Sequence, residues 1–307
     1  MIAKYTRNLC AMMILAATAF ALPALGDPLL EKPGLVTTAW LAGQIDHPGL
    51  RIIDAREGLR PYIQGHLPGA VYLNTETLRL SEGGVPARLL PPDQLAEIFS
   101  KLGIGNGHTV VIYSSGGETF AHATFVAFVL EWLGHRAIGV LDGGYEKWTA
   151  EGRPVTGAFP SFDHARFDPS LNRALMRTAA DVEQAVAERS AVLLDARGPP
   201  MYAAGHIPSA GNYFLERTLE GDAVKTWKSP AELRRLARGA GADGMSPVIT
   251  YCTSGRESSQ IWFTLRHVAG LPDVASYAGS LIDWTSRGLP LARPDGEVNT
   301  ETRQQNE

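Results

Sequence analysis

The feature that most constrains this chain is an internal duplication, because one order of short motifs occurs twice. In the first half, an apolar stretch ends in Asp-Ala-Arg at residues 54–56, and Gly-His-Leu-Pro follows at 65–68. In the second half, an apolar stretch ends in Asp-Ala-Arg at residues 195–197, and Gly-His-Ile-Pro follows at 205–208. The chain therefore repeats one structural unit.

Each unit alternates short apolar stretches with helical patterns. Residues 50–53 and 191–194 are expected to be strands, as are 110–113 and 248–251. Alternation at these short spacings predicts an α/β fold with two tandem domains, each a parallel sheet flanked by helices. The length of 307 residues suits two ordinary domains.

The two domains are expected to meet in residues 157–172, a stretch that contains two prolines and mixed charges and lacks helical periodicity. We place the first domain at residues 27–158 and the second at 159–307, with a polar tail at its C-terminal end.

The most informative stretch is Tyr-Cys-Thr-Ser-Gly-Arg-Glu-Ser at residues 251–258, between the strand at 248–251 and a helical pattern at 259–268. Cys252 follows the carboxyl end of a strand, where α/β proteins bind ligands. A loop there can direct backbone N–H groups and a helix N-terminus at an anion. We therefore expect a nucleophilic cysteine with a lowered pKa; the alternative is a small buried side chain in the core.

The first half provides an internal control, because Ser114 stands where Cys252 stands in the second half. A serine needs an activating base to act as a nucleophile, and no neighbour in sequence supplies one. We expect the first domain to be non-catalytic and to wall the cleft.

Two other residue types also recur. His66 and His206 occupy matching loops, which favours a structural hydrogen bond over catalysis. Arg56 and Arg197 each follow a strand, where a guanidinium can either brace a loop or meet an anionic substrate. The sequence leaves both roles open for Arg197.

The N-terminus resembles an export signal at residues 1–26. Lys4 and Arg7 precede an apolar run at 9–22, and the segment ends in Ala-Leu-Gly. The run is too short for a membrane span, so we expect no stable membrane anchor, and a periplasmic or secreted protein. The net charge is −4 and becomes more negative without these two cations, so no nucleic-acid partner is expected.

As a set, these motifs resemble the tandem-domain rhodanese sulfurtransferases. The match extends over about residues 35–292 and includes Gly-Gly at 143–144 before Trp148 and Gly-Ser at 279–280 before Trp284. The resemblance implies an enzyme whose cysteine takes sulfane sulfur from thiosulfate or 3-mercaptopyruvate, becomes a persulfide, and passes the sulfur to cyanide or a thiol. It implies no cofactor.

Transferred to this sequence, the resemblance makes Cys252 the nucleophile and Arg197 a donor-binding residue. The persulfide cradle then comprises Thr253, Ser254, Gly255, Arg256, Glu257 and Ser258. This loop matches neither the basic version associated with thiosulfate nor the small neutral version associated with mercaptopyruvate. Because Arg256 adds positive charge beside the thiol, we expect thiosulfate to be preferred.

Two alternatives remain open. A cysteine-loop phosphatase would need an arginine six residues after the cysteine, and that position is Ser258. A persulfide carrier without turnover of its own would need only the thiol and an acceptor protein, whose identity the sequence does not reveal. No metal-ligand spacing occurs in the sequence.

Overall fold

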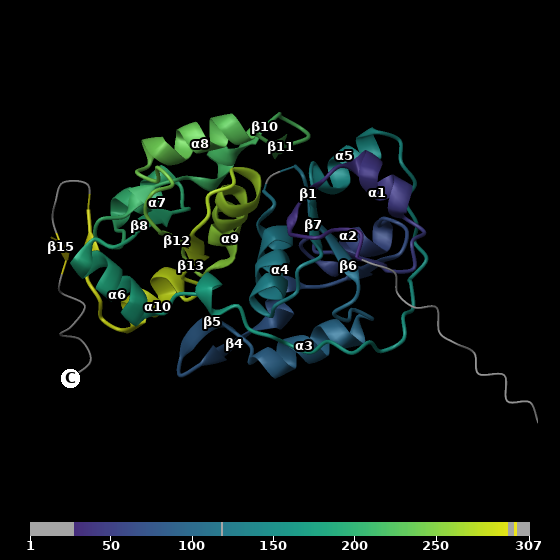
Figure 1. Ribbon diagram of the computed structural model, residues 1–307, viewed down its shortest axis with the longest axis horizontal. Helices are drawn as coiled ribbons and strands as arrows, with labels where there is room; N and C mark the ends of the chain where they lie inside the picture. The colour runs from purple at the N-terminus through teal and green to yellow at the C-terminus, as the bar shows by residue number, and fades with distance from the viewer. Residues whose placement is uncertain (1–27, 118, 294–297, 300–307) are drawn as a thin grey trace, which may run out of the picture.

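The computed structural model describes residues 28–117, 119–293 and 298–299, and it contains two parallel sheets (Figure 1). The first sheet has the order β1-β7-β6-β2-β3 and the second β13-β12-β8-β9. The strands of the first are β1 (Gly34–Val36), β2 (Leu50–Asp54), β3 (Ala70–Tyr72), β6 (Thr109–Tyr113) and β7 (Ile138–Leu141). Those of the second are β8 (Val192–Asp195), β9 (Gly211–Asn212), β12 (Val248–Tyr251) and β13 (Val274–Ser276). Because four strands follow the same order in both sheets, the duplication and the α/β fold are confirmed.

Helices flank both sheets and recur in the same order. The first domain contains α1 (Thr38–Gln44), α2 (Leu59–Gln64), α3 (Pro92–Lys101), α4 (Ala121–Trp132) and α5 (Gly144–Ala150). The second contains α6 (Ala179–Glu188), α7 (Pro199–Ala204), α8 (Pro230–Gly239), α9 (Arg256–Phe263) and α10 (Ser280–Ser286). A short π-helix, η4 (Thr264–Val268), extends α9, and a 3-10 turn, η2 (Arg173–Leu175), precedes α6.

Each domain also carries a 3-10 turn followed by a small antiparallel hairpin. In the first domain these are η1 (Thr75–Leu78) and the strands β4 (Arg79–Glu82) and β5 (Val85–Leu89). In the second they are η3 (Leu215–Thr218), β10 (Leu219–Glu220) and β11 (Thr226–Trp227). A further pair, β14 (Leu291–Ala292) and β15 (Val298–Asn299), closes the described chain.

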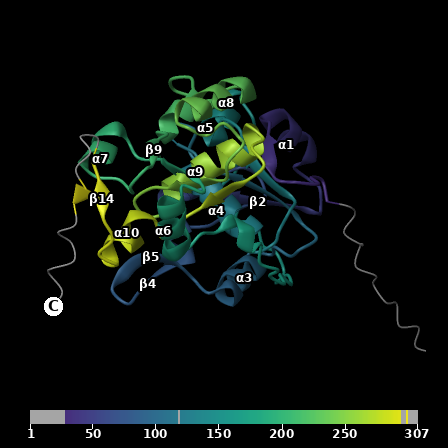
Figure 2. The same ribbon diagram turned by 60° about the vertical axis from the view of Figure 1, so that its left-hand side comes forward.

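Each hairpin lies against the other domain. In both views the β4–β5 hairpin lies beside α10 (Figures 1 and 2), and Arg88 on β5 makes a 3.0 Å ion pair with Asp283 of α10. In return, the N–H of Lys225, in the turn between β10 and β11, donates to the carbonyl oxygen of Gly116 at 2.8 Å. Each hairpin thus contacts the neighbouring domain: β5 contacts α10, and the β10–β11 turn contacts the loop after β6.

The two domains join along α4 and α9, which lie side by side in both views. Helix α4 is apolar over most of its surface, so it requires a neighbour on more than one side. Polar side chains then align the two helices: the Gln260 Oε1 atom accepts from Phe120 N at 2.7 Å, and the Thr124 and Ser259 hydroxyls lie 2.9 Å apart. This interface places the N-terminus of α9 against the first domain.

The expected join at 157–172 is irregular, and part of it packs on the first domain. Ser170 N donates to Leu133 O and Asn172 N to Trp132 O, both at 2.8 Å, and Phe167 is buried. The region is therefore ordered despite its lack of regular structure.

The start of the helix after the cysteine differs from the prediction. The sequence pattern placed it at residue 259, whereas α9 begins at Arg256. Gly255 adopts the left-handed conformation at φ 91° and turns the chain into the helix within three residues of Cys252. Arg256, Glu257 and Ser258 therefore form the first helical turn and not a loop.

Among the described residues, no helix is long and apolar enough to cross a membrane. The predicted signal at 1–26 and most of the polar tail lie outside the described residues.

Candidate active site

Cys252 lies at the carboxyl end of β12, and its side chain is completely buried. Its sulfur accepts a hydrogen bond from Gly255 N at 3.0 Å, and its thiol donates to Glu257 Oε2 at 3.1 Å. Its own N–H donates to Ser280 Oγ, 3.1 Å away, at the start of α10. The sulfur is thus held between a backbone donor and a carboxylate acceptor.

Only glycine fits at position 255. Its φ of 91° is unfavourable for other residues, and a side chain there would collide with the carbonyl oxygen of Ala278. This close approach of the two backbones holds Gly255 N at the sulfur.

The other predicted cradle residues contribute mainly through the backbone. The N–H groups of Ser254 and Ser258 lower the pKa of the thiol, as an anion cradle requires. The Ser258 hydroxyl donates to Gly255 O at 3.1 Å, and Thr253 O accepts from Ile282 N at 3.0 Å. These bonds fix the shape of the turn and leave the amide groups directed at Cys252.

The expectation of a lowered pKa for the Cys252 thiol is wrong. Burial is the largest cause, and the Glu257 carboxylate adds to it by repelling the thiolate and accepting a hydrogen bond from the thiol; together they raise the pKa of Cys252 to about 11. These causes outweigh the backbone N–H groups. The cysteine is therefore a protonated thiol at neutral pH, and its activation needs a route for the proton.

Glu257 is the acceptor that can provide such a route. Its pKa is lowered, because the hydrogen bond from Cys252 and the charges of Arg256 and Arg79 outweigh a large effect of burial in the opposite direction. The carboxylate therefore rests ionised beside the thiol.

Arg256 is engaged by carboxylates from both domains. Its Nη1 lies 2.8 Å from Glu76 Oε1 in η1, and its Nη2 lies 3.3 Å from Glu257 Oε1. The positive charge that the sequence suggested for donor binding is thus largely neutralised by its neighbours.

Arg197 braces its own loop. Its Nε and Nη2 donate to the buried carboxylate of Asp195, and Nη2 also donates to Gly205 O at 2.7 Å. Arg56 makes the same contacts with Asp54 and Gly65 O in the first domain. A geometry shared by both halves favours the bracing role, so donor binding by Arg197 remains a prediction.

The matching histidines are structural. His66 Nδ1 lies 2.9 Å from Tyr62 O, and His206 Nδ1 lies 3.0 Å from Tyr202 O. Each imidazole also stacks on the tyrosine of its own motif.

The corresponding loop of the first domain is filled by one of its own carboxylates. Glu146 of α5 accepts from the Ser115 hydroxyl at 2.7 Å and from Gly116 N. The Ser114 hydroxyl is buried and has no hydrogen-bond partner among the described residues. Because the anion-binding position is occupied internally and the serine has no base, the geometry agrees with a non-catalytic first half.

Sequence reasoning missed the contributions of Glu76, Arg79 and Glu146. Glu76 and Arg79 follow the Gly-His-Leu-Pro motif without a pattern of their own, and only the packing of the two domains brings them to α9. Glu146 is an ordinary helical residue in sequence; its role depends on the turn that precedes α5.

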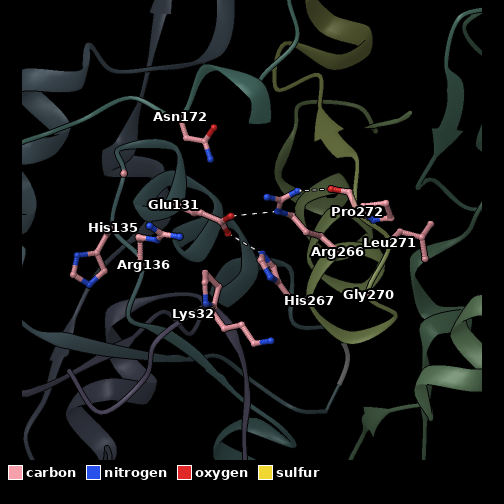
Figure 3. Close-up of a pocket in the computed structure, with 12 residues that line it drawn as sticks. Lys32, Glu131, His135, Arg136, Asn172, Arg266, His267, Gly270, Leu271 and Pro272 are labelled. Atoms are coloured by element: carbon pink, nitrogen blue, oxygen red, sulfur yellow. Dashed lines mark hydrogen bonds and ion pairs between the residues drawn. The ribbon is translucent and has the colours of Figure 1, made fainter. Parts of the chain in front are cut away.

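A cavity of about 600 Å³ lies in the domain interface away from the cysteine turn, between the end of α4 and η4 (Figure 3). In the close-up, Glu131 points between two side chains of the second domain: its oxygens lie 3.3 Å from Arg266 Nε and 2.7 Å from His267 Nε2. No residue of the cysteine turn lines this cavity, so we assign it to the domain interface and not to the chemistry. The described part of the chain contains no cluster of side chains suited to hold a metal ion.

Comparison with known proteins supports the duplication and the fold. The family model described as Rhodanese-like domain matches residues 37–151 and again 178–287. A protein of Synechococcus elongatus is 34% identical over 271 residues, which span 83% of this chain and 84% of that protein. The thiosulfate sulfurtransferase of Bos taurus is 31% identical, over 83% of this chain and 93% of the relative.

Two further similarities bear on function. A protein of Thermus thermophilus described as a sulfur carrier is 30% identical, over 84% of this chain and 96% of that protein. The crystal structure of a 3-mercaptopyruvate sulfotransferase of Escherichia coli superposes with a TM-score of 0.74 at 26% identity, over 80% of this chain and 98% of that one.

Proposed function

The chain belongs to the family of proteins built from rhodanese-like domains, and on that premise we propose that it moves a sulfane sulfur from thiosulfate through a persulfide on Cys252 to a thiol or cyanide. The general activity, sulfur transfer, is supported by relatives that match both domains. Donor, intermediate and acceptor are the finer part of the proposal, with 3-mercaptopyruvate as the less favoured donor.

The single observation that carries the proposal is the environment of the Cys252 sulfur. A buried thiol that contacts both a backbone N–H and an ionised carboxylate is placed for proton transfer followed by nucleophilic attack. Ser114 at the matching position has neither contact.

In the first half-reaction, the thiol proton moves to Glu257 as the Cys252 sulfur attacks the outer sulfur of thiosulfate. The bond from that sulfur to the sulfonate breaks, and its electron pair leaves with sulfite. The persulfide anion then lies at the N–H groups of Ser254, Gly255 and Ser258, and sulfite takes the proton from Glu257. No outside oxidant or reductant is required.

In the second half-reaction, an acceptor thiolate or cyanide attacks the outer sulfur of the persulfide. The sulfur–sulfur bond breaks, the Cys252 thiolate is released, and it regains a proton. Since the described residues contain no second cysteine, the acceptor comes from outside this part of the chain.

The test uses intact-mass spectrometry and turnover together. Thiosulfate should add one sulfur atom to the protein, and cyanide should remove it as thiocyanate over many cycles. Cys252→Ser should lose both reactions, whereas Ser114→Ala should keep most of the rate. Turnover that survives in the Cys252 variant would contradict the proposal.

A second candidate function is a sulfur carrier, which the Thermus thermophilus relative favours. One stable sulfur per chain, with no turnover by small acceptors, is the expected result for a carrier. The same experiment therefore separates the two functions.

Export to the periplasm or outside the cell is also part of our proposal, supported by the basic, apolar and small-residue segments in residues 1–26. The mature N-terminus is expected near Asp27. Exported protein that retains residues 1–26 in its intact mass would contradict this.

A further inference from the structure

Arg79, at the start of β4 in the first domain, has two hydrogen-bond donors without an acceptor. Its Nε and Nη2 atoms are buried, and neither has a partner among the described residues. Buried guanidinium N–H groups in folded proteins are normally hydrogen-bonded. The two unpaired N–H groups of Arg79 are therefore a feature that the fold alone does not explain.

The guanidinium is also held in a fixed plane. Its Cζ atom lies 4.1 Å from the centre of the Phe125 ring in α4, an arrangement that favours a cation over the face of the ring. Nε and Nη2 form one edge of the guanidinium, the edge that binds two oxygens of a carboxylate or sulfonate side by side. Arg79 thus has a guanidinium stacked on Phe125 and an edge, Nε and Nη2, that is not hydrogen-bonded within the described residues.

The Arg79 guanidinium is one of the charged groups near the Cys252 thiol. Arg79 follows Glu76 by three residues, and Glu76 contacts Arg256 at 2.8 Å, the neighbour of Glu257 in α9. Burial lowers the pKa of Arg79 and so does the charge of Arg256, whereas the carboxylates of Glu76 and Glu257 raise it, as would a thiolate at Cys252. Arg79 therefore lies within electrostatic range of Glu257 and of the Cys252 sulfur.

The other arginines that the sequence suggested for this role are engaged. Arg256 is bound by Glu76 and Glu257, and Arg197 by Asp195 and Gly205 O. A dianionic donor must approach a sulfur that already has a carboxylate beside it. A guanidinium with N–H groups that are not already hydrogen-bonded is needed at that point, and Arg79 supplies one through Nε and Nη2.

The duplication provides an internal comparison. Leu219 follows η3 as Arg79 follows η1, and the hairpin that it begins covers the loop of the first domain. That loop has no thiol, and its N–H donor is already bound by Glu146. The cation occurs in the hairpin that faces the cysteine, and an apolar side chain occurs in the hairpin that faces the serine.

We propose that Arg79, supplied by the non-catalytic domain, binds the oxyanion end of the sulfur donor through Nε and Nη2. The ligand class is a small oxyanion that carries transferable sulfur, and thiosulfate is the probe. The inference rests on the proposed function, because it names the donor-binding residue of the same site.

The experiment measures binding without turnover. In a Cys252→Ser background, thiosulfate affinity is determined by isothermal titration calorimetry for the parent, for Arg79→Gln and for Arg79→Lys. Loss of a charge-assisted bidentate contact should weaken binding about tenfold or more in Arg79→Gln. Arg79→Lys keeps the charge and loses the guanidinium edge, so its affinity should lie between the two.

Arg51→Gln is the matched control. Arg51 is also an arginine of the first domain whose guanidinium stacks on a phenylalanine, 4.2 Å from the Phe162 ring, but its Nε donates to Gly103 O at 2.9 Å. Its removal should leave thiosulfate affinity unchanged. Circular dichroism verifies folding, and if Arg79→Gln does not fold, the comparison of Arg79→Lys with the parent decides.

Equal thiosulfate affinity in the parent and in the Arg79 variants would overturn the inference. This holds even if the unmutated protein transfers sulfur normally. Failure of the proposed function is a separate result: the unmutated protein would then acquire no sulfur from thiosulfate, whether or not Arg79 binds the anion.

Discussion

At the scale of single residues, the contact between Cys252 and Glu257 affects both the protonation state of the thiol and its reactivity. The carboxylate raises the pKa of the thiol and so protects it from reactions of the thiolate, such as oxidation. The same carboxylate accepts a hydrogen bond from the thiol at 3.1 Å, so in the proposed mechanism it takes the thiol proton when the donor arrives. One side chain therefore both suppresses the thiolate at rest and provides its route of formation.

This arrangement predicts the effect of Glu257→Gln on thiol reactivity. In the unmutated protein, iodoacetamide alkylation of Cys252 should increase with pH toward an apparent pKa of about 11. Glutamine removes the negative charge that disfavours the thiolate, so the pH profile should move to lower pH. Alkylation rates measured from about pH 6 to about pH 10 test the shift, since the ordinary thiol pKa lies within this range.

Glu76→Gln is the control for Glu257→Gln, because Glu76 contacts Arg256, whereas the hydrogen-bond partners of the sulfur are Gly255, Glu257 and Ser280. Its alkylation profile should remain near that of the parent. An unchanged profile in Glu257→Gln would show that burial alone sets the thiol pKa.

At the scale of elements, the turn from β12 into α9 explains which parts of the site could be predicted. The strand, the cysteine position and the serine at the matching position followed from apolar periodicity and from the duplication. The raised thiol pKa did not, because it depends on the complete burial of Cys252 and on Glu257 turning back onto the sulfur. That happens since α9 begins at Arg256, three residues earlier than the helical pattern indicated.

The same turn predicts a difference between two glycine variants. Gly255→Ala meets both the unfavourable φ of 91° and a collision with Ala278 O, whereas Gly270→Ala, at φ 76°, meets nothing within 4 Å. We expect Gly255→Ala to lower the free energy of unfolding by about 2–4 kcal/mol and Gly270→Ala by about 1 kcal/mol. Urea denaturation followed by circular dichroism measures both.

Gly255→Ala should also slow persulfide formation, because the N–H that contacts the sulfur moves with the turn. Equal stabilities of the two variants would show that the turn relaxes without strain. Equal rates would show that the Gly255 N–H is not needed by the persulfide.

At the scale of the whole molecule, the two copies of the duplicated unit contribute different residues to the surroundings of Cys252. The first domain has lost or never had a thiol, yet its η1 turn places Glu76 beside Arg256, and the start of β4 places Arg79 within electrostatic range of Glu257. Tandem motifs allowed the two-domain fold to be predicted, and the fold is confirmed. These contributions could not be predicted, because they depend on how α4 packs on α9, which no motif encodes.

The last prediction concerns the contact that holds the domains at the far end of this interface (Figure 3). Glu131 is nearly buried at the end of α4 and accepts from Arg266 and His267 of the second domain at 3.3 and 2.7 Å. A glutamine at position 131 has only one side-chain oxygen to accept a hydrogen bond. Its NH₂ group would therefore face the N–H of either Arg266 or His267. We expect Glu131→Gln to lower the free energy of unfolding by about 1–3 kcal/mol, the cost of leaving a buried polar group unsatisfied. Differential scanning calorimetry tests this, with Glu97→Gln as the control, since Glu97 is exposed in α3 and its ion pair with Lys101 should contribute little. Equal midpoints for Glu131→Gln and the parent would mean that apolar packing between α4 and α9 holds the domains together without this contact.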